Sequence, residues 1–87
     1  MPRALTFQRT IVPAAERKRY LARLRERKAY YERANCSFWI FEEAELPGAF
    51  IEFTEAQDRA SLTAAHAKAP DPLVDPARIY VEVELKK

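Results

Sequence analysis

The chain has a single glycine in 87 residues, and this glycine marks the place where the backbone can reverse most sharply. Gly48 follows Pro47, and the pair occupies the two central positions of a four-residue stretch that fits a type II turn. Aromatic and β-branched residues surround this turn, over 36–43 before it and 49–53 after it. Two such runs joined by a tight turn predict a β-hairpin.

Helical segments flank the predicted hairpin on both sides. Residues 14–34 contain no Gly or Pro and are rich in Ala, Arg, Lys, Glu and Leu, so they predict a helix that ends at Asn35. Residues 55–69 are alanine-rich, and we expect Thr54 to cap this second helix. The hairpin therefore lies between two helices.

Two alternating segments lie outside the helices. Residues 4–12 alternate apolar and polar side chains, and residues 79–85 do so strictly, which predicts two further strands. The proline-rich residues 70–78 predict an irregular loop, inside which Leu73 and Val74 need somewhere to bury.

The resulting order β-α-β-β-α-β predicts one α+β domain over residues 1–87 with a ferredoxin-like arrangement. Right-handed crossovers place both helices on one face of a four-stranded antiparallel sheet with the strand order 4-1-3-2. Alternation within the strands then predicts which side chains face the helices: Ile40, Ile51, Phe53, Ile79, Val81 and Val83. The opposite, uncovered face would carry Trp39, Phe41, Phe50, Glu52, Tyr80 and Glu82, joined by Thr6, Gln8 and Thr10.

Composition narrows the classes of function. One cysteine, Cys36, cannot form an internal disulfide, and one histidine, His66, is too few for a typical zinc site. No apolar run is long enough to cross a membrane, and the first residues lack a signal-peptide core, so we expect a soluble cytoplasmic protein without a cofactor. Residues 14–34 carry a net charge of +5 and the rest −3, which predicts a basic helix on an acidic remainder.

The layout resembles the dimeric α/β-barrel superfamily, which includes the antibiotic-biosynthesis monooxygenase-like and NIPSNAP-like families. The resemblance covers nearly the whole chain and lies in these segments: Val12-Pro13 at a strand end, the charged helix, Phe38-Trp39-Ile40-Phe41, 47–54 and 79–85. It implies a homodimer whose two sheets close a barrel, with a pocket beside each uncovered sheet face.

Members of this superfamily suggest two kinds of chemistry. Some oxidise phenolic substrates without a cofactor by means of Asn, Trp and Arg side chains, and this resemblance implies such roles for Asn35 and Trp39. Haem-degrading members use a histidine on the second helix, where His66 lies. The accompanying first-strand Asn and second-helix Trp are absent here, so the resemblance does not favour haem degradation.

The same element order also resembles the RNA-recognition motif. Residues 49–53 match the second half of its ribonucleoprotein octapeptide, but Leu46, Pro47 and Gly48 replace the first half. Glutamates on the uncovered face and basic residues on the helix side disfavour nucleic acid as a partner.

Three functions follow from this interpretation. The first is a homodimer that binds a small aromatic or carbonyl-bearing molecule, with monooxygenase-like activity left open; the second is a nucleic-acid-binding module; the third is a structural dimer without catalysis. The candidate ligand-binding residues are Trp39, Phe50, Glu52, Tyr80, Asn35 and His66. Each also has a structural interpretation. The aromatic rings pack an interface, Glu52 pairs with Arg9 or a partner subunit, Asn35 ends a helix in the left-handed conformation, and His66 lies at the surface or at an edge.

Overall fold

The fold is given by a computed structural model, which describes residues 2–69 and 78–85. Its elements, in chain order, are β1 (Ala4–Ile11), the short 3₁₀ turn η1 (Ala14–Glu16), α1 (Arg17–Arg33), β2 (Ser37–Glu42), β3 (Ala49–Ala56), α2 (Arg59–Ala67) and β4 (Tyr80–Val81). The expected loop at 70–78, with Leu73 and Val74, lies outside the described residues except for Arg78.

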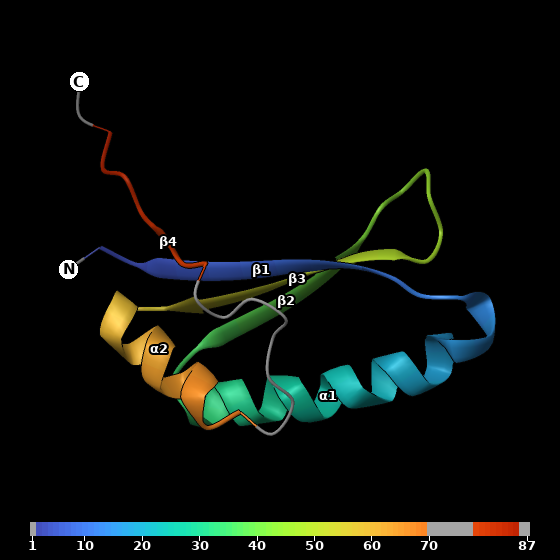
Figure 1. The fold of residues 1–87 in the computed structure, drawn as a ribbon, viewed down its shortest axis with the longest axis horizontal. Coiled ribbons are helices and arrows are strands. Elements are labelled where there is room, and N and C mark those ends of the chain that lie inside the picture. The colour runs from blue at the N-terminus through green and yellow to red at the C-terminus, as the bar shows by residue number, and fades with distance from the viewer. Residues whose placement is uncertain (1, 70–77, 86–87) are drawn as a thin grey trace.

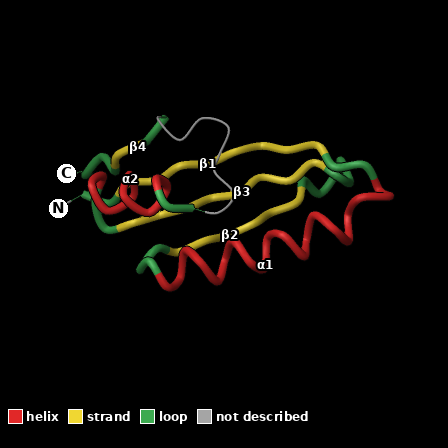
Figure 2. Tube along the Cα trace, turned by 60° about the horizontal axis from the view of Figure 1, so that its bottom comes forward, coloured by secondary structure: helices red, strands yellow, loops and turns green. Residues whose placement is uncertain are grey.

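The four strands form one antiparallel sheet in the order β2-β3-β1-β4. This is the predicted order 4-1-3-2, counted from the other edge. Both helices lie on the same side of the sheet (Figure 1), and a turned view shows α1 running beneath the β2 edge (Figure 2). The prediction of an α+β domain with two helices on one face of a four-stranded sheet is therefore confirmed.

Helix α1 ends in a Schellman motif, with Asn35 at its end in the left-handed conformation expected from the sequence. Asn35 adopts a φ of 63°, in the left-handed region where Asn is tolerated. The Cys36 N–H donates to the Tyr31 carbonyl over 2.8 Å, and the Asn35 N–H donates to the Glu32 carbonyl over 3.1 Å. The structural interpretation of Asn35 is thus confirmed.

The hairpin turn also follows the prediction. Gly48 has a φ of 94°, and the Ala49 N–H donates to the Leu46 carbonyl over 3.1 Å, which is the geometry of a type II turn. The Gly48 carbonyl accepts from the Val12 N–H at 2.7 Å, so the turn is tied to the end of β1. A β-carbon on Gly48 would lie 2.7 Å from the Val12 carbonyl oxygen, which is too close for any other residue type.

The boundaries of three elements differ from the prediction. Strand β3 continues to Ala56 because all eight of its residues pair with β1, so Thr54 is a buried strand residue rather than a helix cap. Helix α2 starts later, at Arg59, and its cap is Asp58, whose carboxylate accepts from the Ser61 N–H at 2.7 Å. Strand β4 is shorter than expected, because pairing with β1 covers only Tyr80 and Val81.

The largest correction concerns which side chains face the helices. Phe50 and Glu52 point toward the helices and are buried, whereas Ile51 and Phe53 point to the uncovered face. The β1 residues paired with the helix-facing residues of β3 also lie on the helix side. They are Thr6, Gln8 and Thr10, of which Thr6 is buried. The expected facing was wrong because a carboxylate in a strand suggests exposure, whereas the core here supplies a partner for it. Ile40 and Ile79 pack against the core as predicted, whereas Val83 lies beyond β4 and is exposed.

Candidate functional site

The uncovered side of the sheet carries the more apolar of the two rows of side chains. We call this surface the open face; it comprises Leu5, Phe7, Trp39, Phe41, Ile51, Phe53 and Tyr80. Trp39 is 43% exposed and Phe41 is 57% exposed, although both belong to residue types that usually bury. An exposed apolar surface of this kind usually marks an interaction site.

The rings of the open face form a connected series. Phe7 lies 5.2 Å from Tyr80 and 6.0 Å from Phe53, measured between ring centroids, and Phe53 lies 5.8 Å from Phe41. Cross-strand pairing sets these contacts, since Phe53 is the register partner of both Phe7 and Trp39. The series extends across all four strands and forms one continuous aromatic surface.

Charged residues lie at the two ends of the open face. At one end the Arg9 guanidinium lies 3.2 Å from the Glu43 carboxylate, and both side chains are exposed. At the other end Arg3 lies 2.9 Å from Glu55 and 3.1 Å from Glu82. The apolar centre of the face thus has a positive and a negative group at each end.

The helix side of the sheet holds a buried ion pair. Glu52 is 2% exposed, and its carboxylate accepts hydrogen bonds from the Arg27 guanidinium and, at 2.8 Å, from the Tyr20 hydroxyl. Burial raises the pKa of Tyr20 above its ordinary value, and the hydrogen bond to Glu52 adds to the increase. Glu52 therefore faces the core and makes structural contacts there.

A second buried polar group surrounds His66 on α2. One ring nitrogen lies 2.8 Å from the Thr6 hydroxyl and the other 2.7 Å from the Tyr31 hydroxyl. Burial lowers the pKa of His66, and the positive charge of Arg27 adds to the decrease, so the neutral ring is favoured. A neutral imidazole donates through one nitrogen and accepts through the other, so it can satisfy both hydroxyls. Burial also raises the pKa of Tyr31 to about 12, which keeps its hydroxyl protonated.

The predicted site residues are divided among three places. Trp39 and Tyr80 lie on the open face as expected, whereas Phe50, Glu52 and His66 are buried on the opposite side of the sheet. Asn35 is exposed at the end of α1. The prediction that His66 lies at the surface was wrong, and Glu52 pairs with Arg27 rather than with Arg9. No single pocket could use all six residues.

Sequence reasoning missed Phe7 and Phe53 on the open face and Arg27 in the core. A signal for Arg27 was present, because its spacing from Tyr20, Leu24 and Tyr31 puts all four on one helical stripe. Burying a guanidinium on that stripe requires a carboxylate opposite, and Glu52 on β3 supplies it. This pairing would have fixed the facing of the strand.

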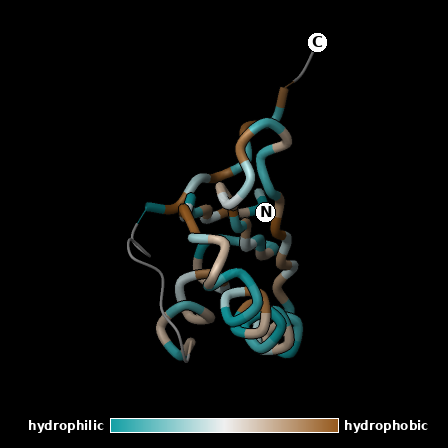
Figure 3. Tube along the Cα trace, turned by 90° about the vertical axis from the view of Figure 1, so that its right-hand side faces the viewer, coloured by the Kyte–Doolittle hydropathy of each residue, from teal (hydrophilic) through white to brown (hydrophobic). Residues whose placement is uncertain are grey.

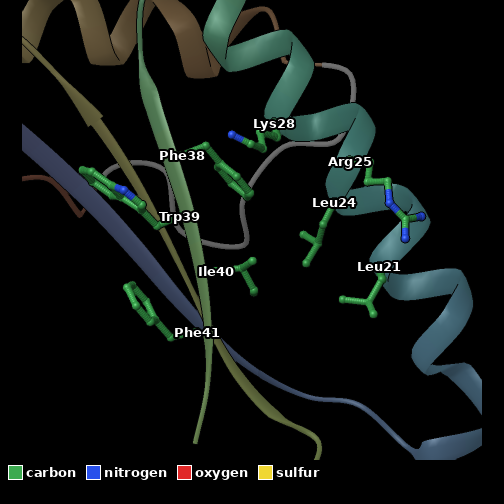
Figure 4. Close-up of a pocket in the computed structure, with 8 residues that line it drawn as sticks. All are labelled: Leu21, Leu24, Arg25, Lys28, Phe38, Trp39, Ile40 and Phe41. Carbon is green, nitrogen blue, oxygen red and sulfur yellow. The ribbon is translucent and has the colours of Figure 1, made fainter.

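A groove of about 410 Å³ runs between α1 and β2. Leu21, Leu24, Arg25 and Lys28 form its helix wall, and four consecutive residues of β2, Phe38 to Phe41, form the other wall. Figure 4 shows Phe38 and Ile40 on the side of β2 toward α1, with Trp39 and Phe41 on the other side. The groove therefore follows the outer edge of the sheet.

Other kinds of site receive no support within residues 2–69 and 78–85. No group of three or more His, Cys, Asp or Glu side chains in that part of the chain is arranged to hold a metal ion. Neither α1 nor α2 has the length and apolarity of a membrane span. The thiol of Cys36 is buried, and burial raises its pKa, which lowers its reactivity.

Fold and site together define an α+β protein with a ferredoxin-like arrangement, a hydrophobic core under the helices that includes buried polar groups, and an apolar open face. Comparisons of the chain with protein-family models, with curated proteins and with solved structures found no match.

Proposed function

We propose that the protein acts as a homodimer in which the open faces of two copies pack against each other, as in a dimeric α/β barrel. The observation that carries the proposal is that large apolar side chains lie on both sides of the sheet, although the helices cover only one side. The helix side buries Phe38 and Phe50 beside the polar Thr6, Glu52 and Thr54, whereas no layer among the described residues covers the aromatic rings of the open face. In a lone monomer this arrangement would leave the most apolar surface in water.

Charge supports a second copy as the occupant of the open face. A two-fold axis brings a surface against itself, so a face with one sign of charge would repel its partner. Here Arg9 and Glu43 at one end, and Arg3 and Glu55 at the other, give each end both signs. Either end of one copy can therefore meet either end of the other with opposite charges in contact.

The size of the chain supports the same conclusion. A domain of this length buries only about 60–65% of the surface that its unfolded chain exposes, so its own core gives limited stability. Covering the open face would bury further rings at roughly 25 cal/mol for each Å² of apolar surface. Dimerisation would thus supply stability that the core alone lacks.

A second candidate function is the binding of a small aromatic or carbonyl-bearing molecule between the two faces. The specific observation is that Trp39 and Phe41 are the most exposed rings of β2, in the same sheet as the guanidinium of Arg9. Flat rings stack on aromatic ligands, and a guanidinium binds a carboxylate or phenolate. Catalysis by Glu52 or His66 is not part of this proposal, because both are buried behind the sheet.

The basic helix gives little support to nucleic-acid binding. Single-stranded nucleic acid needs stacking rings and cations on one surface. The rings lie on the open face, whereas α1, which is mostly hydrophilic in Figure 3, lies behind the sheet. Arg3 and Arg9 on the open face are both paired with glutamates.

Fluorescence of Trp39, the only tryptophan, tests the ligand proposal. We expect a panel of phenols and quinones to include compounds that quench it saturably, and we expect Arg9→Met to weaken binding of the anionic ones about tenfold. Ala60→Asp, on an exposed helix position, serves as the control. If no compound gives a saturable change, the ligand proposal fails while the dimer proposal stands.

A further inference from the structure

The groove between α1 and β2 has the size and lining of a small-molecule site. Such sites commonly have volumes of about 300–1,000 Å³, mostly apolar walls and a few polar groups. This groove measures about 410 Å³, and six of its eight lining residues are apolar, so it favours a ligand with an apolar body. Because β2 is the last strand of the sheet, no further strand among the described residues closes the groove.

The charged residues that line the groove are both cations. Arg25 and Lys28 of α1 are exposed, and no Asp or Glu lies among the lining residues. Residues three positions apart on a helix are surface neighbours, with β-carbons about 5–6 Å apart. One anionic group could therefore contact both side chains, and the groove favours an anion at this point.

Both cations are available to a ligand. None of the ion pairs within residues 2–69 and 78–85 includes Arg25, whose guanidinium can bind a carboxylate through two parallel hydrogen bonds. Lys28 lies 2.8 Å from the Glu32 carboxylate, but both side chains of this pair are more than half exposed. Exposed pairs of this kind contribute little stability, so exchanging Glu32 for a ligand carboxylate costs little.

The length of the groove limits the length of the ligand. In Figure 4 Lys28 and Phe38 lie at one end of the groove and Leu21 lies at the other. The helix rises about 10 Å from Leu21 to Lys28. Strand β2 extends by a similar distance, about 10 Å, from Phe38 to Phe41. A carbon–carbon bond is about 1.5 Å long, so an extended chain of about eight carbons reaches roughly 9 Å and matches this length.

We propose that the groove binds a medium-chain alkyl carboxylate. The carboxylate lies between Arg25 and Lys28, and the alkyl chain lies along Leu21, Leu24 and Ile40. Aliphatic walls and a cationic end together complement an amphiphile with one negative charge. One copy of the chain forms this site alone, so the proposal does not depend on the dimer. The site also differs from the aromatic-ligand site proposed for the open face.

Titration of the full chain with octanoate, followed by amide chemical shifts, tests the inference. We expect saturable binding with a dissociation constant of about 0.1–1 mM, typical for a ligand of this size. The shifted amides should lie in residues 21–28 and 38–41. Saturable shifts confined to β1 and β4 would place the ligand on the open face and would overturn the groove site.

A pair of charge variants tests the anion contacts. Arg25→Gln/Lys28→Gln should weaken octanoate binding at least about tenfold, because it removes both charge-assisted contacts. The matched control is Lys18→Gln/Arg19→Gln, which removes the same charge from exposed positions of α1 outside the groove and should bind octanoate like the native chain. Equal weakening in the two variants would show that only the net charge of the protein matters and would overturn the site.

A series of ligands tests the head group and the length. Octanamide, which is uncharged, should bind at least about tenfold more weakly than octanoate. Each methylene added between butanoate and octanoate should tighten binding about three- to fourfold, and the gain should stop near ten carbons, where the groove ends. Equal affinity for octanamide and octanoate, or no saturable change with octanoate up to 10 mM, would contradict the proposal.

Discussion

At the residue scale, the buried pair of Glu52 and Arg27 explains the facing of the sheet. A carboxylate in the core is tolerated only when it is paired and hydrogen-bonded, and Arg27 and Tyr20 meet both conditions. Because Glu52 points inward, its neighbours Ile51 and Phe53 point outward. One ion pair therefore determines the apolar character of the open face.

Removing one member of this pair should destabilise the fold strongly. Arg27→Met leaves a buried carboxylate without its cation, and we expect the free energy of unfolding to fall by about 3–5 kcal/mol. Arg27→Met/Glu52→Gln removes both charges and should recover much of that loss. Urea unfolding measures both effects. A double variant no more stable than Arg27→Met would contradict this role.

His66 should make stability depend on pH. Its pKa in the fold lies below the ordinary value of 6.5, so the unfolded chain binds a proton more readily than the fold does. The neutral His66 ring contributes its full stability above about pH 6.5. This contribution is lost as the pH falls toward the pKa that His66 has in the fold, and the free energy of unfolding then decreases by at most about 1.4 kcal/mol per pH unit. Unfolding measured between pH 7.5 and about pH 5 should show this slope.

His66→Gln is the matched variant for the pH measurement, since glutamine keeps hydrogen-bonding groups but does not titrate in this range. We expect it to lose the slope. Half-buried Glu42, whose pKa is lowered to about 2 by Arg17 and by the Gly48 N–H, affects stability only below about pH 4.5, so its titration does not overlap with that of His66. An unchanged slope in His66→Gln would assign the effect to other groups.

At the element scale, the hairpin turn depends on Gly48. Gly48→Ala forces a β-carbon into a left-handed backbone and against the Val12 carbonyl, so we expect a loss of about 1–3 kcal/mol. Leu46→Ala in the same turn, at an exposed position with negative φ, should cost much less. Thermal or urea unfolding of the two variants makes the comparison. Equal losses of unfolding free energy in the two variants would contradict the requirement for glycine at position 48.

Local sequence signals predicted most elements but not their boundaries or facing. The type II turn at Gly48 and the end of α1 at Asn35 were predictable because they depend on backbone preferences of single residues. The start of α2 was not, since Thr54 and Asp58 are both good caps and only the pairing of β3 with β1 decides between them. The length of β4 likewise depends on its partner strand.

The candidate site was predicted only in part for a related reason. Both rows of β3 contain large apolar residues, so alternation alone could not tell which row faces the helices. Tyr80 was placed correctly because residues 79–85 alternate strictly, whereas both rows of β2 contain large apolar residues, so alternation alone did not determine the facing of Trp39. Phe50 and Glu52 were misplaced because the facing of β3 depends on Arg27, a contact between residues 25 positions apart.

At the scale of the whole molecule, aromatic residues on the two sides of the sheet should respond differently to truncation. Phe50 packs in the core 4.9 Å from the Tyr20 ring, so Phe50→Ala should lower the free energy of unfolding by about 3–5 kcal/mol. Phe41 and Trp39 are exposed, so Phe41→Ala and Trp39→Ala should leave a folded chain but raise the dimer dissociation constant at least about tenfold. Circular dichroism and sedimentation velocity separate these outcomes. Open-face variants that dimerise like the native chain would contradict the interface.

Sedimentation equilibrium of the unmodified chain tests most directly whether a second copy covers the open face. We predict a mass of twice 10.1 kDa at protein concentrations of about 10–100 µM, within the range that a modest interface supports. A mass of 10.1 kDa throughout that range would mean that the aromatic surface stays in water, and would contradict the account.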